Sequence, residues 1–343
     1  MNRALVDRIA NALLYEGYIL YPYRPSVRNR QRWNFGGLYP EAYCQAIGEA
    51  ASNQTQCLVN GTTATRIEVV IRFLHLTARI IGEVDPPRKE WPKEGEVPFR
   101  PVPTLQIGEQ LLHTWQEAEE REIALAAMTL GDVSAQPCCV PFRFLGGRRS
   151  EPVRDANGQI AGVVRREQQA IEGEIEVAAS EAAEGLFRLT CRVSNRTAPL
   201  VSQPASRDEA LLRTLVSAHT ILGVRDGAFV SLLDPPECWS DCAAACRNLG
   251  VWPVLVGEEG QTDTMLSSRI ILYDYPQLAP ESPGDFFDGT EIDEMLALRI
   301  LTLTEEEKRA MAAVDERARH LLERTESMAE AQLRGLHGAI RDF

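Results

Sequence analysis

The sequence predicts an α+β protein with a β-rich, sandwich-like N-terminal domain, a mixed α/β C-terminal domain and a helical C-terminal tail. Strand-like runs separated by turn residues occupy residues 46–200, strand and helix patterns alternate over residues 201–303, and residues 304–343 show helical periodicity. A chain of 343 residues is also longer than most single cores, which favours more than one domain.

The first 45 residues contain a short helix followed by a basic, aromatic segment. Apolar residues at helical spacing predict a helix over Ala4–Tyr15. In the segment Tyr18–Tyr43 no acidic residue precedes Glu41, although the chain carries a net charge of −13. Its prolines and glycines exclude a regular helix, so we expect an ordered loop. The residues that define the segment are Arg24, Arg28, Arg30, Arg32, Trp33, Phe35 and Tyr39.

Arginines interleaved with aromatic residues are typical of two kinds of surface. One binds RNA or single-stranded nucleic acid, and the other is a protein–protein interface. No RNA-recognition signature accompanies the segment, and the acidic net charge disfavours phosphate binding. We therefore favour a protein interface, or an internal contact with the acidic C-terminal region, over an RNA-binding role.

The β-rich region contains several local signals. Asn60-Gly61 lies between apolar runs and predicts a hairpin, and a second hairpin is expected around Gly108. Thr114 and Glu117 match a capping box, which predicts a short helix. Alternating apolar residues over Leu186–Val193 predict a strand with one buried face.

The C-terminal region combines helix starts with short apolar runs. Ser206 and Glu209 form a capping box that predicts a helix through His219, and a hairpin is expected at Asp226-Gly227. A further helix is expected over Pro235–Asn248. The runs "VWPVLVG" and "RIILYDY" that follow it predict two buried strands and a parallel βαβ unit.

The tail begins with two more helix signals. Thr290 with Asp293, and Thr304 with Glu307, start helices near residues 291 and 305. Small or apolar residues recur at helical spacing in the second helix, which predicts that it packs one face against the body of the protein.

Acidic residues follow the predicted strands of the C-terminal domain. Ligands of α/β sheets bind beyond the carboxyl ends of the strands, where converging carboxylates could hold a hard cation or transfer protons. For each residue alone, a helix cap or a solvated loop is the favoured interpretation. The candidates are Asp234, Glu237, Glu258, Glu259, Asp263 and Asp274.

Three cysteines, Cys238, Cys242 and Cys246, lie at i, i+4 and i+8 of the predicted helix and share one face of it. They could bind a soft metal, but structural metal sites draw their ligands from closely spaced loop residues and need a fourth ligand. Because buried cysteine is a common small apolar residue, packing against a sheet is favoured and no cofactor is predicted.

A second docking segment is expected over Pro276–Asp288, where prolines and acidic residues surround Phe286 and Phe287. The cysteines do not resemble the disulfide framework of a small secreted domain, and no apolar run reaches the length of a membrane span. We therefore expect a cytoplasmic protein with no membrane insertion.

Three stretches of the sequence resemble a known group of proteins. They are "RNRQRWNFGGLYP", "HTILGVRDGAFVSLLDPPE" with "CRNLGVWPVLVGEEG", and "LSSRIILYDYPQLAPESPGDFFDGTEIDEMLALRILTLT". The chain resembles bacterial proteins encoded beside actinobacterial-type NiFe hydrogenases. The resemblance implies a role in assembling, maturing or accompanying a hydrogenase, and it assigns no catalytic residue.

The sequence therefore favours a non-enzymatic accessory protein that binds a hydrogenase subunit or a maturation partner. Its contacts would lie in Tyr18–Tyr43 or Pro276–Asp288. A metal-binding protein or enzyme that uses the carboxylates at the strand ends is the alternative. An RNA-binding protein is the third possibility.

Overall fold

The structure is a computed structural model that describes residues 3–15, 36–92, 95–198, 206–277, 300–313 and 316–327. It confirms a β-rich α+β fold. Most of its strands form two large antiparallel sheets. The smaller sheet has five strands in the order β14 (Ala228–Val230), β1 (Ser52–Asn60), β12 (Leu186–Asn195), β11 (Ile171–Ala183) and β8 (Cys138–Phe144).

The larger sheet has nine strands, and its centre is β2 (Arg66–Arg88), which is 23 residues long. Its main path runs β15 (Trp252–Leu255), β16 (Thr264–Ser268), β13 (Val216–Arg225), β2, β10 (Ile160–Gln168) and β9 (Gly147–Arg154). Three more strands pair with β2, namely β3 (Arg100–Val102), β6 (Trp115–Ala124) and β7 (Met128–Thr129). The hairpin expected around Gly108 is confirmed as β4 (Thr104–Ile107) and β5 (Gln110–His113).

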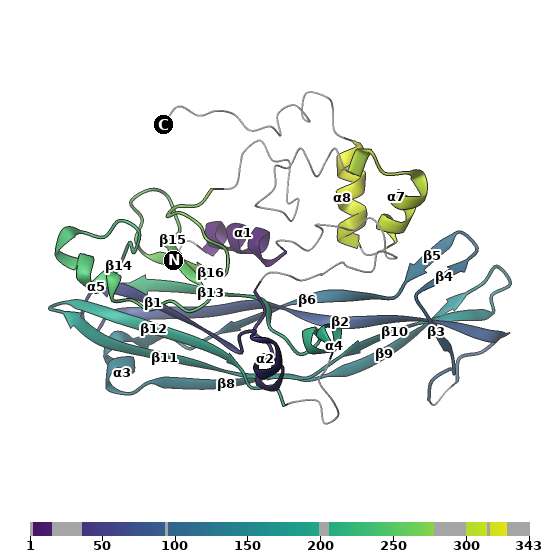
Figure 1. Cartoon of the computed structure of the whole chain (residues 1–343), viewed down its shortest axis with the longest axis horizontal. Helices are drawn as coiled ribbons and strands as arrows, with labels where there is room; N and C mark the ends of the chain where they lie inside the picture. The colour runs from purple at the N-terminus through teal and green to yellow at the C-terminus, as the bar shows by residue number, and fades with distance from the viewer. Residues whose placement is uncertain are drawn as a thin grey trace.

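Helices cover parts of both sheets. In Figure 1, α1 (Arg3–Leu14), α7 (Glu305–Ala312) and α8 (Glu316–Glu326) lie above the strands, and β3, β4 and β5 lie at the right-hand end. The remaining helices are short: α2 (Glu41–Ile47), α3 (Leu130–Ala135), α4 (Arg207–Leu211), the 3-10 turn η1 (Glu237–Trp239) and α5 (Ser240–Ala244).

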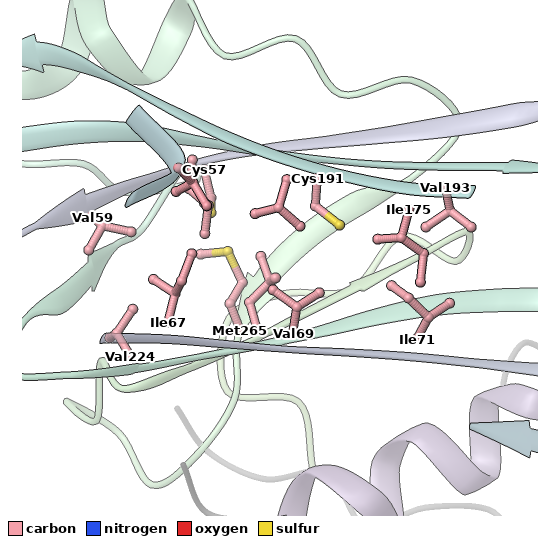
Figure 2. Packing of buried hydrophobic residues seen from close by; sticks show 14 of the residues in the cluster. Cys57, Val59, Ile67, Val69, Ile71, Ile175, Cys191, Val193, Val224 and Met265 are labelled. Carbon is pink, nitrogen blue, oxygen red and sulfur yellow. The ribbon is translucent and has the colours of Figure 1, made fainter. Parts of the chain in front are cut away.

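The largest core lies between the two sheets. Cys57, Cys191 and Ile175 of the smaller sheet are fully or almost fully buried, and they belong to one cluster with Val69 and Met265 of the larger sheet (Figure 2). Burying an aliphatic side chain of this size contributes about 1.5–3 kcal/mol. The interior therefore has the layered arrangement of a β-sandwich.

Two turns that the sequence assigns to hairpins instead connect the sheets. Asn60-Gly61 joins β1 of the smaller sheet to β2 of the larger sheet, and Asp226-Gly227 joins β13 of the larger sheet to β14 of the smaller sheet. The two corners meet, because the Thr65 hydroxyl donates to the Asp226 carbonyl at 2.8 Å. The hairpin predictions are wrong because a turn signal marks a reversal but does not choose the partner strand.

The predicted parallel βαβ unit is also wrong. The strand pair in this region, β15 and β16, is antiparallel, and the run "RIILYDY" lies beyond β16 in non-strand backbone. In addition, β13 pairs with β2 and β14 pairs with β1, so strands from both sides of the predicted boundary at residue 200 share the same two sheets.

Capping boxes had mixed outcomes. Those at Ser206–Glu209 and Thr304–Glu307 are confirmed at the starts of α4 and α7. The helix predicted after Thr114 is wrong, because Trp115–Ala124 is β6 and pairs along its whole length with β2. The helix predicted through His219 ends at Leu211, and His219 lies in β13.

Prolines lie on the open sides of two edge strands. In β11, the backbone N–H of Glu172 donates to the Thr197 hydroxyl at 3.0 Å and its carbonyl accepts from Arg196 at 2.8 Å, both on the side away from β8. Glu174 lies two residues further along β11 and faces the same way as Glu172. Pro141 lies opposite Glu174, so its nitrogen faces away from β11, toward the open edge of β8. Pro253 in β15 has the same orientation. The backbone N–H and carbonyl of Leu255, two residues further along, bond to Asp274 and Tyr275 on the side away from β16, so the nitrogen of Pro253 also faces that side. Such prolines oppose pairing with another chain.

Candidate functional site

Most of the first predicted docking segment lies outside the described residues, including Arg24, Arg28, Arg30, Arg32, Trp33 and Phe35. Its last part is described and forms part of the core. Leu38 exchanges two backbone hydrogen bonds with Leu215, at 3.0 and 3.1 Å. Tyr39 is 3% exposed and stacks on Tyr43 with 5.3 Å between ring centroids. Tyr39 therefore anchors the end of the segment, and its prediction as a surface contact is corrected.

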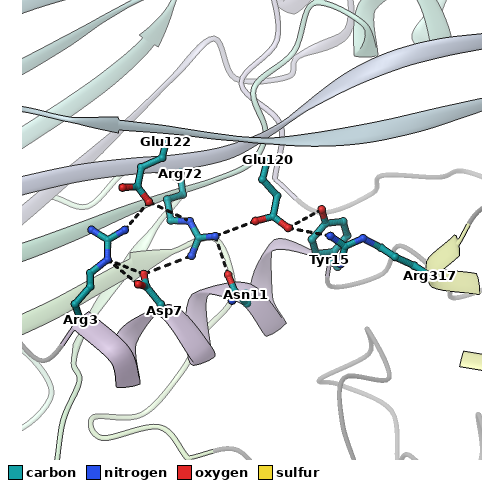
Figure 3. Close-up of polar contacts among 8 residues, drawn as sticks. All are labelled: Arg3, Asp7, Asn11, Tyr15, Arg72, Glu120, Glu122 and Arg317. Carbon is teal, nitrogen blue, oxygen red and sulfur yellow. Dashed lines mark hydrogen bonds and ion pairs between the residues drawn. The ribbon is translucent and has the colours of Figure 1, made fainter. Parts of the chain in front are cut away.

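The entry to this segment is held by Tyr15, the residue that follows α1. The Tyr15 hydroxyl donates to Glu120 Oε1 at 2.9 Å, and Arg317 Nη2 of α8 donates to the same oxygen at 2.9 Å. The guanidinium carbon of Arg317 lies 3.7 Å from the Tyr15 ring centroid (Figure 3). Burial raises the pKa of Tyr15, so the hydroxyl stays protonated and keeps donating.

Arg72 of β2 is the centre of the polar network that fixes α1. Its side chain is 9% exposed and donates to Asn11 Oδ1 at 2.7 Å and to Glu120 Oε2 at 3.1 Å. Asp7 and Glu122 lie 3.6 and 3.8 Å from other nitrogens of the same guanidinium (Figure 3). One strand residue thus ties together α1, β6 and, through Glu120, α8.

The exit from the segment is held by Arg269, which follows β16. Its Nη1 donates to the Gly37 carbonyl at 3.0 Å and its Nε donates to the Gly250 carbonyl at 3.1 Å. Gly36 has φ +66°, and a Cβ atom there would lie 2.0 Å from Arg269 Cδ. Only glycine combines this backbone conformation with so close an approach.

The second predicted docking segment begins at the same strand. Phe286 and Phe287 lie outside the described residues, but the residues that lead into the segment are described. Asp274 Oδ1 accepts from the Leu255 N–H at 2.7 Å, and Tyr275 N–H donates to the Leu255 carbonyl at 2.8 Å. The chain returns at Ile300, which is buried against the helices of the tail.

Both predicted docking segments are therefore anchored beside β15. The contact between Gly250 and Arg269 lies beside the first residue of β15, and the contacts of Asp274 and Tyr275 lie at its last residue, Leu255. A strand of four residues spans roughly 13 Å at about 3.3 Å per residue.

The acidic residues predicted to form a ligand site do not converge. Asp274 is a structural residue, because its Oδ2 also accepts from the Ser231 hydroxyl at 2.6 Å. Asp263 Oδ1 accepts from the Thr264 hydroxyl at 2.8 Å. The others, Asp234, Glu237, Glu258 and Glu259, are exposed. Among the described residues, no group of three or more His, Cys, Asp or Glu is arranged to hold a metal ion.

The three-cysteine face does not form, because α5 is five residues long and begins after Cys238. Cys238 is exposed, whereas Cys242 and Cys246 are half-buried beside the apolar cluster of Leu58 and Leu186. Burial raises the pKa of Cys246, which disfavours the thiolate that a metal needs.

Sequence reasoning missed the exposed apolar residues around β15. Trp252 is 44% exposed, Ile271 72% and Tyr273 86%. Ile270 and Leu272 pack inward against the cluster that contains α1, so the extended run after β16 alternates between inward and outward apolar residues. The alternation was visible in "RIILYDY", but an apolar run alone does not show which residues remain uncovered.

Comparisons with known proteins assign the chain to no family. No protein-family model matches the sequence, and no curated protein matches it either. A solved chain of the Salmonella SPI-1 type III secretion injectisome secretin InvG is 12% identical, with a TM-score of 0.12. The match covers 66% of this chain and 59% of that one, and a similarity this weak carries no argument about fold or function. No described helix has both the length and the apolar character of a membrane span.

Proposed function

We propose that the protein is a cytoplasmic, non-enzymatic accessory protein that binds a NiFe hydrogenase subunit or a maturation partner. The observation that supports this most directly is the shared anchoring of its two aromatic-rich segments. Arg269 holds the exit of the first segment, and Asp274 and Tyr275 hold the entry to the second, at the two ends of one edge strand. A partner that contacts one segment can therefore reach the other.

The chemistry of the segments agrees with protein binding. Arginine, tyrosine and tryptophan are the residues that most often dominate binding energy at protein interfaces. The scaffold beneath them is fixed by the buried Arg72 network and by the apolar face of α1, so the anchors keep their separation. Anchors at fixed positions reduce the entropy that is lost when a partner binds.

The test is affinity capture of the tagged protein from its source cells during growth on hydrogen. Wild-type protein should retain a hydrogenase subunit or a maturation protein. The combined variant Arg28→Glu, Arg30→Glu and Arg32→Glu should lose most of it, whereas Arg149→Glu, on the exposed edge strand β9, should not. Equal capture by all three proteins, or capture of neither kind of partner, would refute the proposal.

A further inference from the structure

We infer that the exposed edge beside β15 is a docking surface for an acidic, apolar segment of a partner protein. The β15 surface is defined here as Trp252, Ile271 and Tyr273. This inference rests on the proposed function and adds to it the place and the chemistry of the contact.

Exposed apolar side chains lie along the edge strand β15. Among the described residues, six large apolar side chains are exposed, and three of them form the β15 surface. Trp252 lies opposite Ser268 in the strand ladder, and Asp274 bonds to Leu255 three residues further along β15. Ile271 and Tyr273 lie in the stretch between Ser268 and Asp274, so they follow the outer side of the same short strand. Exposed apolar side chains gathered along one strand edge indicate an interaction site.

The edge is unsuited to pairing with another strand, which determines how a partner can bind. Pro253 has no N–H to donate, and both backbone groups of Leu255 are already bonded to Asp274 and Tyr275. A partner must therefore use side-chain contacts, with its own apolar residues placed against the aromatic rings.

Charge indicates the rest of the partner's chemistry. Arg269 lies beside the surface, bonded only to carbonyls of Gly37 and Gly250 among the contacts of the described residues. Glu49 is the carboxylate whose charge acts on Arg269, but among the described residues it forms no ion pair with it. Arg247, five residues before Trp252, is exposed and also has no ion pair among the described residues. A partner that brings carboxylates next to its apolar anchors meets the exposed charge of Arg247 here, and that of Arg269, which Glu49 balances without a direct ion pair.

The experiment is site-specific photo-crosslinking of the full-length chain in its source cells, with p-benzoylphenylalanine at position 271 or at position 145. Position 145 is the control for position 271. Leu145 and Ile271 are almost equally exposed, at 71% and 72%, but Leu145 lies between β8 and β9, away from β15. The crosslinked peptides are sequenced. We expect position 271 to capture a partner peptide with apolar residues and at least two Asp or Glu, and position 145 to capture none.

The double variant Trp252→Ser and Tyr273→Ser should reduce that capture about tenfold or more, since aromatic anchors carry a large share of binding energy. Tyr273 is 86% exposed and Trp252 44%, so only a small change in urea unfolding should accompany the loss. Crosslinks to a second copy of this chain, to its own residues or to a basic peptide would overturn the inference, and so would equal capture at both positions. If the wild type retains a hydrogenase partner without a crosslink at 271, the inference fails while the proposed function stands. If an acidic, apolar peptide of another kind of protein is captured, the surface is supported and the hydrogenase role fails.

Discussion

Replacing Arg72 with methionine should weaken the structure more than replacing any exposed arginine. Arg72 makes two hydrogen bonds of 2.7 and 3.1 Å, and Asp7 and Glu122 lie at 3.6 and 3.8 Å. The variant keeps the volume of the stem but removes the one cation that Asp7, Glu120 and Glu122 all share. Arg3 still pairs with Asp7 and Glu122, and Arg317 still pairs with Glu120, so the loss is partial.

The magnitude follows from burial on the two sides of the network. A hydrogen bond to a charged group contributes about 1.5–3 kcal/mol, and breaking a fully buried ion pair costs about 3–5 kcal/mol. The carboxylate side chains are 33%, 38% and 44% exposed, so water compensates part of the loss. We expect the free energy of unfolding to fall by roughly 2–4 kcal/mol.

Urea unfolding followed by circular dichroism measures this directly. Arg319→Met is the matched control, because Arg319 of α8 is 49% exposed and its ion pairs with described residues are surface pairs of 3.5 and 3.9 Å. Arg319→Met should lower the free energy of unfolding by less than about 1 kcal/mol. Adding Glu120→Gln to Arg72→Met should cost less than the sum of the single changes by about 1 kcal/mol, since contacting residues are coupled. Equal losses of unfolding free energy for Arg72→Met and Arg319→Met would show that the Arg72 network does not stabilise the fold. Full additivity of Arg72→Met and Glu120→Gln would show that the two residues are not coupled.

Three further perturbations have definite expected outcomes. Burial lowers the pKa of His75 and of His219 to about 4, from 6.5 for an exposed imidazole. As the pH falls, the unfolded chain binds these protons before the folded protein does. The free energy of unfolding should therefore keep its full value above pH 6.5 and decrease toward pH 4. His219→Leu should make this decrease smaller in urea unfolding measured across that pH range. Pro141→Val should restore an outward N–H on β8 and increase self-association in sedimentation velocity, whereas an unchanged monomer fraction would contradict the edge argument. Thr304→Ala removes the confirmed cap of α7 and should cost about 1 kcal/mol, measured as faster hydrogen exchange in α7 and α8 with the sheets unaffected.

Local signals were sufficient where the structure itself is local. The helix α1, the hairpin around Gly108 and the caps at Ser206 and Thr304 all depend on residues within a few positions of one another. The alternation in β12 also gave the buried face, since Leu189, Cys191 and Val193 lie in the core between the sheets.

Signals failed where distant strands decide the outcome. Thr114 and Glu117 match a capping box, yet ten residues of β6 pair with β2, and that long ladder outweighs one cap. Asn60-Gly61 does reverse the chain, but β1 finds its partner in β12, more than a hundred residues away. Hydrophobic periodicity does not report which strand lies next to which, so the predicted parallel pair could not be tested before the structure.

The candidate site was foreseen only in part. Composition singled out the two aromatic-rich segments, but not that Arg269 and Asp274 anchor them beside one strand. Those anchors depend on contacts to Gly37 and Leu255, which no short motif encodes. The predicted acidic site failed for the same reason, because it assumed parallel strands whose carboxyl ends meet at one edge.

A partner that binds the β15 surface should also contact the two docking segments. Hydrogen–deuterium exchange of the purified protein, alone and with its captured partner, tests this most directly. We predict slower exchange upon binding in peptides that cover residues 18–38 and 269–290, with no change in the β9–β10 hairpin around residues 147–168. A stable complex that protects the β9–β10 hairpin and leaves both segments unchanged would contradict the claim.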